Sequence, residues 1–432
     1  MPVTLSLPRL IFGYFCAVMW LRTCFTVLVG SLLLPLWPLH AQTKGNTAPL
    51  ASHRRQELAY PDSRMQKRYR IAVIVPLYLD ELVRGESVTF KDKVPDKAAD
   101  GLAFYQGLKL AADSLRRMGA RLDIDVYDAG SFAQSPDMLI SNRKLDSVDF
   151  IIGAVEQHDI PSLANYARKK RINFVSALTN YDGWVKDNQY FTLLQPSVKS
   201  HCEFVIDELS RRYPEQNVTL CYRTSSLADD NAALYILNDL YADVVFRKMQ
   251  CNQVPTRDEL AAVLDTTRPN IIAMSILDPV YADSLLSCLA RYFPSVHFDV
   301  YGMPTWQHMA SLRRTDAYQN ITVYVPYPFS YDNADSVLLG HLKETFAGEF
   351  GGTPPEMALR GYETMLWYGS LLRSYGTIFN DKYSDLSAAP FTSFRIRPRW
   401  DANGSLLYLE NRNIYMTVFQ AGLSHTIRPA GK

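Results

Sequence analysis

The chain has 432 residues, of which 47% are hydrophobic and 21% are charged. This is the composition of an ordinary globular protein, and the length suits two domains. Its 45 Lys and Arg residues nearly balance its 44 Asp and Glu residues, and such a neutral chain argues against nucleic acid as the main partner.

The first 41 residues are predicted to be a signal peptide. They contain two Arg residues, no acidic residue and an apolar run from Phe25 to Leu39, and they end in the small residue Ala41, as export signals do. The run is short for a membrane span, which needs about 20 apolar residues. Residues 10–21 add a second apolar piece, so an uncleaved anchor stays open, and translation from Met19 would give a signal of ordinary length. We expect a periplasmic protein, cleaved near Ala41, with no membrane span afterwards.

Residues 42–69 carry clustered positive charge and no apolar periodicity. Runs of this kind usually serve as solvated linkers, and we interpret this one as a disordered basic leader. A tether for an acidic membrane or cell-wall surface is the alternative.

The globular part begins with a predicted strand, helix and strand. Ile71–Val75 is a continuous apolar run, typical of a parallel strand covered on both faces. Apolar residues recur at helical spacing from Phe104 to Met118, and residues 122–127 alternate as a second strand does. Parallel units of this kind place their ligand loops at the carboxyl ends of the strands.

Four segments carry a resemblance to a known family: IAVIVPLY (71–78), FYQGLKLAADSLRRMG (104–119), LDIDVYDAG (122–130) and GYETMLWYGSLLRSYG (361–376). Over roughly residues 70–425, the chain resembles type I periplasmic binding proteins of the leucine/isoleucine/valine-binding kind, which are substrate-binding proteins of ABC transporters. The resemblance implies an α/β fold of two doubly wound, Rossmann-like lobes joined by a three-crossing hinge. It also implies a non-enzymatic protein that holds a small ligand in the cleft between the lobes.

Strand and helix patterns alternate in two blocks, which agrees with two lobes. Lobe 1 is assigned to residues 70–195 and 327–393, and lobe 2 to residues 196–326 and 394–425. The crossings are expected near Leu194–Ser197, Val325–Asn333 and Phe391–Asn403. Asp401–Gly404 is a turn signal that predicts a closing hairpin.

The loop from Leu77 to Lys97 is long for a strand-to-helix connection, which usually takes about 2–6 residues. It lies where the first strand meets the expected cleft. A lid, a partner-docking loop and a family insertion are equally open interpretations.

The motifs of common enzyme classes are missing. There is no G-x-S-x-G, no phosphate loop ending in GK[ST], no H-E-x-x-H and no G-x-G-x-x-G after a strand. The eight His residues share no metal-ligand spacing. We therefore predict no catalytic residue, no metal site and no cofactor.

Four Cys residues follow the signal, namely Cys202, Cys221, Cys251 and Cys288. Export would permit a disulfide, but buried thiols suit these positions equally well. The sequence alone does not reveal a pairing.

Polar residues that follow predicted strands are the candidate ligand-binding residues. On lobe 1 they are Tyr78, Asp80, Glu156, Gln157, Thr179, Asn180 and Tyr181. On lobe 2 they are Arg223, Thr224, Asp278 and Thr305. Their hydrogen-bond donors could bind a carboxylate of a ligand, and their carboxylates could bind an amine of a ligand. Strand-end loops are polar in any case, however, because they are exposed to water. Trp184, close to Tyr181, either stacks on a ligand or caps the core of lobe 1.

One departure from the resembled family concerns the ligand. Amino-acid binders of that family have small hydroxyl residues directly after the third-strand Gly, and an Ala/Thr pair after the fourth strand. Here Gly153 is followed by Ala154-Val155-Glu156-Gln157, whereas Ala177 and Thr179 partly match the second site. The resemblance therefore does not extend to an α-amino acid as ligand.

Three functions from different classes remain open, of which an enzyme is the least favoured because its motifs are missing. The first is an exported solute-binding protein that captures a small polar ligand, such as an amino acid, a peptide or a wall fragment, for an importer or sensor. The second is a cell-envelope scaffold or regulator that uses the same fold to bind protein partners. The long Leu77–Lys97 loop and the missing hydroxyls favour the second, and convergent polar groups in a cleft would favour the first.

Overall fold

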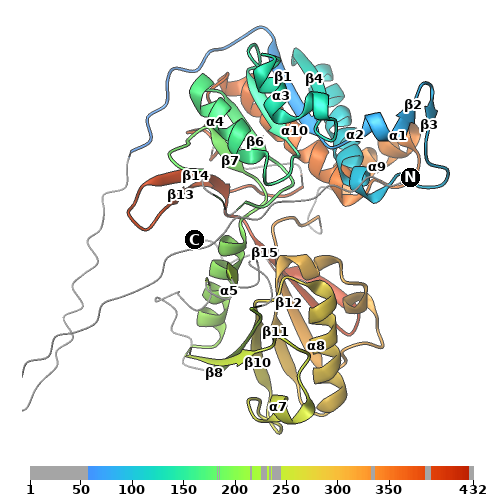
Figure 1. The fold of residues 1–432 in the computed structure, drawn as a ribbon, viewed down its shortest axis with the longest axis vertical. Helices are drawn as coiled ribbons and strands as arrows, with labels where there is room; N and C mark the ends of the chain where they lie inside the picture. The colour runs from blue at the N-terminus through green and yellow to red at the C-terminus, as the bar shows by residue number, and fades with distance from the viewer. Residues whose placement is uncertain are drawn as a thin grey trace, which may run out of the picture. The chain divides into compact units, whose positions relative to one another are not determined.

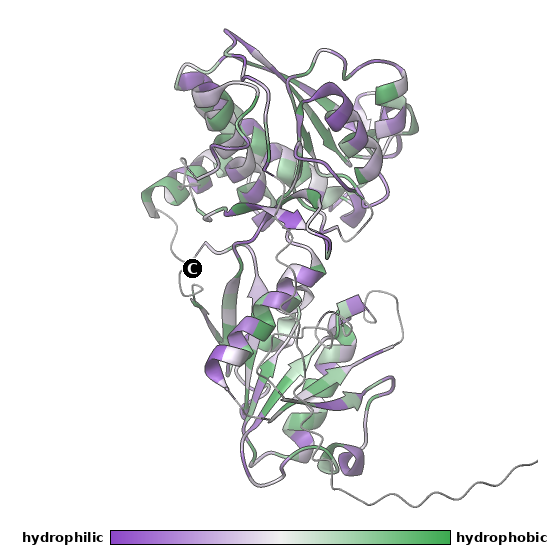
Figure 2. Cartoon of the chain, turned by 90° about the vertical axis from the view of Figure 1, so that its left-hand side faces the viewer, coloured by the Kyte–Doolittle hydropathy of each residue, from purple (hydrophilic) through white to green (hydrophobic). Residues whose placement is uncertain are grey.

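The structure is a computed structural model that describes residues 57–427, except 182, 184, 215–216, 225–230, 233–234, 236–244, 332–335 and 385–390. The described chain forms two α/β lobes, each built on a seven-stranded sheet (Figure 1). Hydrophobic residues gather along the strands of the sheets (Figure 2). The predicted fold class is confirmed.

The sheet of lobe 1 has the strand order β13-β14-β7-β6-β5-β1-β4, and only its β13–β14 pair is antiparallel. The strands are β1 (Tyr69–Val75), β4 (Leu122–Asp128), β5 (Phe150–Gly153), β6 (Asn173–Ser176), β7 (Phe191–Leu193), β13 (Ile396–Trp400) and β14 (Leu406–Asn411). All five residues from Ile71 to Val75 are fully buried, as expected for a strand covered on both faces.

Two helices of lobe 1, α2 (Asp96–Arg117) and α10 (Glu356–Tyr375), cross with their backbones in contact. A Cβ on Gly107 would lie 1.8 Å from the Ala358 carbonyl oxygen, and one on Gly361 would lie 2.0 Å from that of Phe104. Only glycine permits such an approach. The other helical segments described in lobe 1 are α1 (Leu79–Leu82), α3 (Pro136–Ser141), α4 (Ile160–Lys170), α9 (Ser336–Phe350) and the short η1 (Phe132–Gln134).

The sheet of lobe 2 has the order β16-β15-β12-β11-β10-β8-β9, with β9 at one edge. Its strands are β8 (Asn217–Tyr222), β9 (Val245–Gln250), β10 (Asn270–Met274), β11 (Phe298–Tyr301), β12 (Ile321–Tyr327), β15 (Tyr415–Gln420) and β16 (Leu423–Ile427). Strands β8 to β12 are parallel, and β15 is antiparallel to both neighbours. The helical segments are α5 (Val198–Arg212), α7 (Arg257–Ala261), α8 (Pro279–Tyr292), η2 (Pro304–His308) and η3 (Ala310–Arg313).

Strands β13 and β14 correct the lobe boundaries that the sequence suggests. Residues 394–425 were predicted to belong to lobe 2, but β14 pairs in parallel with β7, with Leu409 opposite Thr192. The chain enters the sheet of lobe 2 only at β15, which pairs with β12. The last crossing therefore follows Asn411 and does not lie near Phe391–Asn403. A turn signal predicts the hairpin but carries no information about the sheet that the hairpin joins.

A buried carboxylate on β14 fixes the first crossing. Glu410 is fully buried, and its Oε1 accepts hydrogen bonds from the Ser197 backbone N–H and the Ser200 hydroxyl, both at 2.8 Å. On the neighbouring strand, Arg399 makes a bidentate pair with Glu203 of α5, at 2.8 and 2.9 Å. The start of α5 is thus held by two strands of lobe 1.

The described part of the leader, residues 57–69, corrects a second expectation, because it is an extended strap on lobe 1. The Gln66 amide donates to Asp149 at 2.6 Å, and the Arg64 carbonyl accepts from the Thr377 backbone N–H at 3.2 Å. The ring of Tyr60 packs edge-on against that of Tyr190. A charge-rich segment without periodicity can still be ordered when its backbone finds partners in the rest of the fold.

The long loop after β1 contains the short helix α1 and a two-stranded hairpin, β2 (Val83–Arg84) and β3 (Ser87–Val88). Val83 is 39% exposed and Val88 57% exposed. The loop therefore presents apolar side chains to solvent.

Candidate functional site

The loop after β1 is organised by Asp128, at the carboxyl end of β4. This buried carboxylate accepts four backbone N–H groups: those of Leu77, Tyr78 and Gly130 on Oδ1 at 2.8–2.9 Å, and that of Leu79 on Oδ2 at 2.7 Å. Tyr78 adopts a left-handed conformation with φ of 54°. Asp128 was not among the residues predicted from the sequence, although its place at the end of an alternating strand was a usable signal.

The two sequence candidates in this loop contact neighbouring groups. Lys97 lies 4.6 Å from the centre of the Tyr78 ring, and the Ser131 hydroxyl donates to Asp80 at 2.5 Å. Asp80 is exposed. These contacts close the loop on itself.

The candidates after β5 and β6 meet one another. The Thr179 hydroxyl donates to the Val155 carbonyl at 2.5 Å, and the Gln157 amide lies 3.3 Å from the Asn180 amide oxygen. Glu156 and Gln157 are exposed. Two neighbouring strand ends are thus joined by their own polar groups, as parallel topology predicts.

Tyr181 is a core residue. Its side chain is 4% exposed and packs edge-on against Phe191 and Tyr408. The ring is thus held by core contacts with two other aromatic side chains, and a role of Tyr181 in binding a ligand stays a prediction. Trp184 lies outside the described residues.

Arg360 of α10 is a buried cation at the same edge of lobe 1, and the sequence analysis missed it. Its guanidinium donates to the Ala177 carbonyl at 3.1 Å and to the Gln195 amide oxygen at 2.8 Å, and lies 3.9 Å from the centre of the Phe329 ring. The residue is 4% exposed. It connects the loops after β6 and β7 to the segment after β12.

Glu363, one turn further along α10, is fully buried. Burial raises its pKa to about 8, against the lowering effect of the Thr392 and Phe391 backbone N–H groups that donate to it. Its other oxygen has no hydrogen-bond partner among the described residues. A carboxyl with this pKa is largely protonated at neutral pH.

On lobe 2, Asp278 begins α8 and holds Arg223. Asp278 accepts the Val280 and Tyr281 backbone N–H groups at 3.0 and 3.2 Å, which caps the helix. Its second oxygen lies 3.2 Å from the Arg223 guanidinium, which stacks 4.0 Å from the centre of the Tyr281 ring. The loops after β8 and β10 thus meet in the structure.

Thr224 is joined to Asn252 at the edge of the sheet. Its backbone N–H donates to the Asn252 amide oxygen at 2.9 Å, and its hydroxyl accepts from the Asn252 and Gln250 amides at 2.9 and 2.8 Å. Asn252, which follows β9, was not among the sequence candidates.

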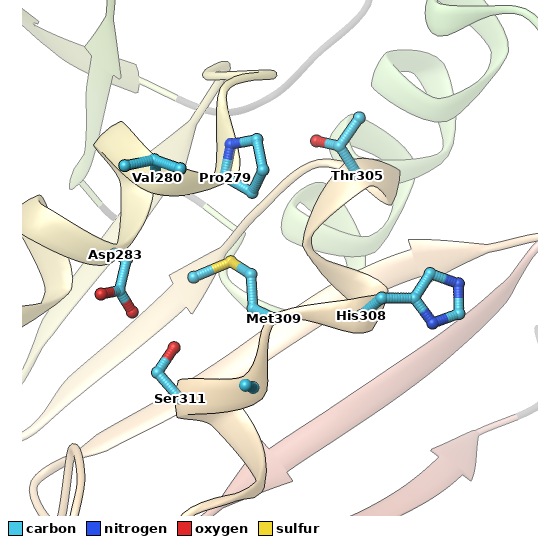
Figure 3. A pocket seen from close by; sticks show the side chains of 8 residues that line it. Pro279, Val280, Asp283, Thr305, His308, Met309 and Ser311 are labelled. Carbon is cyan, nitrogen blue, oxygen red and sulfur yellow. The ribbon is translucent and has the colours of Figure 1, made fainter. Parts of the chain in front are cut away.

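An open hollow of about 390 Å³ lies at the carboxyl ends of β10 and β11 (Figure 3). The start of α8 and the turns η2 and η3 form its walls. The lining residues are Pro279, Val280, Asp283, Thr305, His308, Met309, Ala310 and Ser311. Both apolar and polar side chains line it, and the His308 ring points away from the Asp283 carboxylate.

Several of these side chains have fixed positions. The Thr305 hydroxyl donates to the Leu277 carbonyl at 2.7 Å, and Asp283 accepts from the Tyr318 hydroxyl at 2.5 Å. His308 lies 3.5 Å from Glu356 of α10. Val280 is 75% exposed at the mouth. A small molecule with an apolar part and a few polar groups fits this lining.

A larger hollow, about 540 Å³, lies at the opposite, amino-terminal edge of the lobe 1 sheet, beneath the strap. Arg168 and Asp187 line it and pair with each other. Parallel α/β sheets bind ligands at the carboxyl ends of their strands, so the hollow of lobe 2 is the stronger candidate.

Among the described residues, no three His, Cys, Asp or Glu side chains come together as metal ligands could. No helix in this part of the chain is both long and apolar enough to cross a membrane.

The fold matches solved binding proteins. A Rhodospirillum rubrum protein assigned to branched-chain amino acid ABC transport aligns with a TM-score of 0.62 and 14% identity, over 83% of this chain and all of that one. A Burkholderia xenovorans periplasmic ligand-binding protein of a branched-chain amino acid ABC transporter aligns with a TM-score of 0.54 and 15% identity, over 83% of this chain and 94% of that one. A Desulfitobacterium hafniense ABC transporter substrate-binding protein in complex with Leu aligns with a TM-score of 0.53 and 14% identity, over 83% of this chain and all of that one.

No protein-family model matches the sequence, and no curated protein matches it. The similarity to the solved structures alone establishes the type I periplasmic binding protein fold.

Proposed function

We propose that the protein is an exported, non-enzymatic binding protein that captures a small polar ligand at the carboxyl ends of its strands, for an importer or a sensor. The observation that carries the proposal is the 390 Å³ hollow of lobe 2, which lies at the edge where parallel sheets bind ligands. The similarity to solved substrate-binding proteins supports it.

The chemistry of the hollow narrows the class of ligand. Val280 and Met309 offer apolar contact, while Thr305, His308 and Ser311 offer hydroxyl and imidazole groups. Asp283, the carboxylate that lines the hollow, already accepts the Tyr318 hydroxyl. Because this carboxylate is committed, it is poorly placed to bind a ligand's amine as well. We therefore favour a ligand whose polar groups are hydroxyls or amides.

Thermal unfolding of the mature protein tests the proposal. A ligand present at about 100 times its Kd adds about 2.7 kcal/mol to apparent stability, which is a clear shift in Tm. The panel should contain amino acids, short peptides, sugars and cell-wall fragments at millimolar concentration. A shift that saturates with one compound class is expected, and no shift with any class would contradict solute binding.

A second candidate function, a scaffold or regulator of the cell envelope, rests on a separate observation. The β2–β3 hairpin exposes Val83 and Val88, and the exposed Phe132 follows the neighbouring strand β4. Apolar side chains that are exposed together on one loop can form a contact surface for a protein partner. Pull-down from envelope extracts with the wild type and with Val83→Ser/Val88→Ser tests this function, which requires that the double variant lose a partner.

A further inference from the structure

One edge of lobe 1 carries exposed positive charge. The loops that precede its parallel strands lie together at the amino-terminal edge of the sheet. Exposed cations on this edge that have no ion-pair partner among the described residues are Lys67 before β1, Arg121 before β4, Arg143 and Lys144 before β5, and Lys169 at the end of α4. We call these residues the basic edge.

Carboxylates at the same edge already have other cationic partners. Asp123 at the start of β4 lies 2.9 Å from the Arg68 guanidinium, and Asp146 before β5 lies 2.9 Å from the Lys170 ammonium. The positive charges of the basic edge are therefore not cancelled by these carboxylates, and they are available to an external anion.

The strap, residues 57–68, is fixed on this edge (Figure 1). The Ser63 hydroxyl donates to the Tyr375 carbonyl at the end of α10, at 2.5 Å. Gly376 has a φ of 82°, and a Cβ on it would lie 2.6 Å from the Arg64 carbonyl oxygen. Because the strap packs this closely on lobe 1, Lys67 belongs to the surface of the lobe. The acidic residues of the strap, Glu57 and Asp62, lie further back and line the two hollows beside Tyr60.

Two exposed methionines share the edge with these cations. Met65 of the strap is 63% exposed, and Met118, which follows α2, is 47% exposed. Apolar side chains next to Lys and Arg are a combination that suits the boundary between lipid headgroups and acyl chains. The methionines are a second observation, independent of the charge, that points to the same kind of partner.

The path of the chain also leads to this edge. The apolar run of the sequence ends at Leu39, and residues 40–56, which contain Arg54 and Arg55, join it to the start of the strap at Glu57. Whatever precedes Glu57 is therefore attached to lobe 1 at the edge that carries the cations, and not at the carboxyl ends of the strands.

Helix ends explain only part of the basic edge. Cations near a helix C-terminus interact favourably with the helix dipole, which accounts for Lys169 in the last turn of α4. Lys67 and Arg121 lie outside the helices. At the carboxyl edge of the same lobe, by contrast, Lys93 and Lys97 each pair with a carboxylate.

We propose that the basic edge of lobe 1 docks on the surface of an anionic phospholipid membrane. Charge complementarity supplies the attraction, which acts within about 10 Å of the surface at physiological salt, and Met65 and Met118 enter the headgroup layer. The inference goes beyond the proposed function, because it assigns a second partner to the opposite ends of the strands. Docking in this orientation leaves the carboxyl edge of lobe 1 facing away from the lipid.

Sedimentation with vesicles tests the proposal on the mature protein, from Gln42 to Lys432. One set of vesicles is phosphatidylcholine alone, and the other is phosphatidylcholine and phosphatidylglycerol in equal parts. We expect binding to the second set, and the binding should fall as NaCl is added because salt screens the charges. Equal binding to both sets, or binding that salt leaves unchanged, would overturn the proposal.

A pair of triple variants separates the basic edge from net charge. Each Lys near an anionic surface strengthens binding roughly fivefold, so Lys67→Gln/Lys144→Gln/Lys169→Gln should lose roughly 100-fold in vesicle affinity. The control is Lys91→Gln/Lys248→Gln/Lys343→Gln, which removes the same charge at exposed positions away from this edge. The control should bind within a few fold of the wild type, and equal losses from both variants would contradict a localised surface.

Two further arms identify the partner. Met65→Ser/Met118→Ser should also weaken vesicle binding, since the apolar contact is lost while the charge is kept. Sedimentation with purified peptidoglycan tests the other anionic material of the envelope, and binding to it without binding to phosphatidylglycerol vesicles would overturn the membrane as partner. None of these assays contains the solute ligand, so their failure leaves solute binding untouched.

Discussion

The strand-end edges of the two lobes use their polar residues differently. On lobe 1, Asp128 is saturated by four backbone N–H groups, Thr179 is bonded to a carbonyl, and Tyr181 and Arg360 are buried. On lobe 2, His308 and Ser311 line an open hollow together with Thr305, although the Thr305 hydroxyl is also bonded to a backbone carbonyl. Polar residues at a strand end thus serve loop structure, recognition or both, and we propose that those facing an open hollow are the ones that take part in recognition.

The largest expected effect is at Asp128. Replacing it by alanine removes the acceptor of four backbone N–H groups, and we expect a loss of about 4 kcal/mol in the free energy of unfolding, measured with urea. Asp80→Ala is the matched control, because this exposed carboxylate accepts only the Ser131 hydroxyl among the hydrogen bonds of this loop, and it should cost less than about 1 kcal/mol. Similar losses from both variants would mean that Asp128 does not organise the loop.

The next effect is the dependence of folding stability on pH that comes from Glu363. Its folded pKa of about 8 lies above the ordinary value of 4.5, so the carboxyl contributes full stability below pH 4.5. As pH rises toward 8, the unfolded state releases the proton and the folded state keeps it, and stability falls by on the order of 3 kcal/mol.

Glu363→Gln should flatten this decline between pH 5 and pH 8 in urea titrations, since an amide does not ionise. The conservative variant keeps the hydrogen bonds of the Phe391 and Thr392 backbone N–H groups. An unchanged pH slope in the variant would show that Glu363 ionises normally in the folded protein.

A smaller effect is expected at the start of α8. Asp278→Ala removes the cap and the Arg223 partner and should cost about 1–2 kcal/mol. Asp278→Asn keeps a capping oxygen and loses only the charge, and should cost about 0.5 kcal/mol. Equal costs, read from thermal unfolding, would assign the whole effect to the ion pair.

Much of the fold could be predicted because local patterns decide it. The apolar run at Ile71–Val75 and the helical stripe of α2 correctly predicted buried elements. The sheet to which β14 belongs could not be predicted, since pairing with β7 depends on contacts about two hundred residues apart in the sequence. The ordered conformation of residues 57–69 likewise depends on contacts with residues of lobe 1 that are distant in the sequence.

The candidate site was harder to predict, for a physical reason. Two pairs of strand-end candidates meet in the structure, Arg223 with Asp278 and Gln157 with Asn180, and their role in ligand binding stays a prediction. The sequence did not reveal that Tyr181 turns into the core, nor that Arg360 points inward from a helix whose charges would normally be solvated. Both depend on the approach of distant segments.

The central claim is that ligand recognition is concentrated in the hollow of lobe 2. Titration calorimetry with the ligand that gives the largest thermal shift tests it most directly, on the wild type, Val280→Trp and Val254→Trp. Both valines are exposed on lobe 2, at 75% and 45%, but only Val280 lines the hollow. We predict that Val280→Trp weakens binding at least about tenfold, or about 1.4 kcal/mol, while Val254→Trp leaves it unchanged. Equal affinity in all three proteins would contradict the claim.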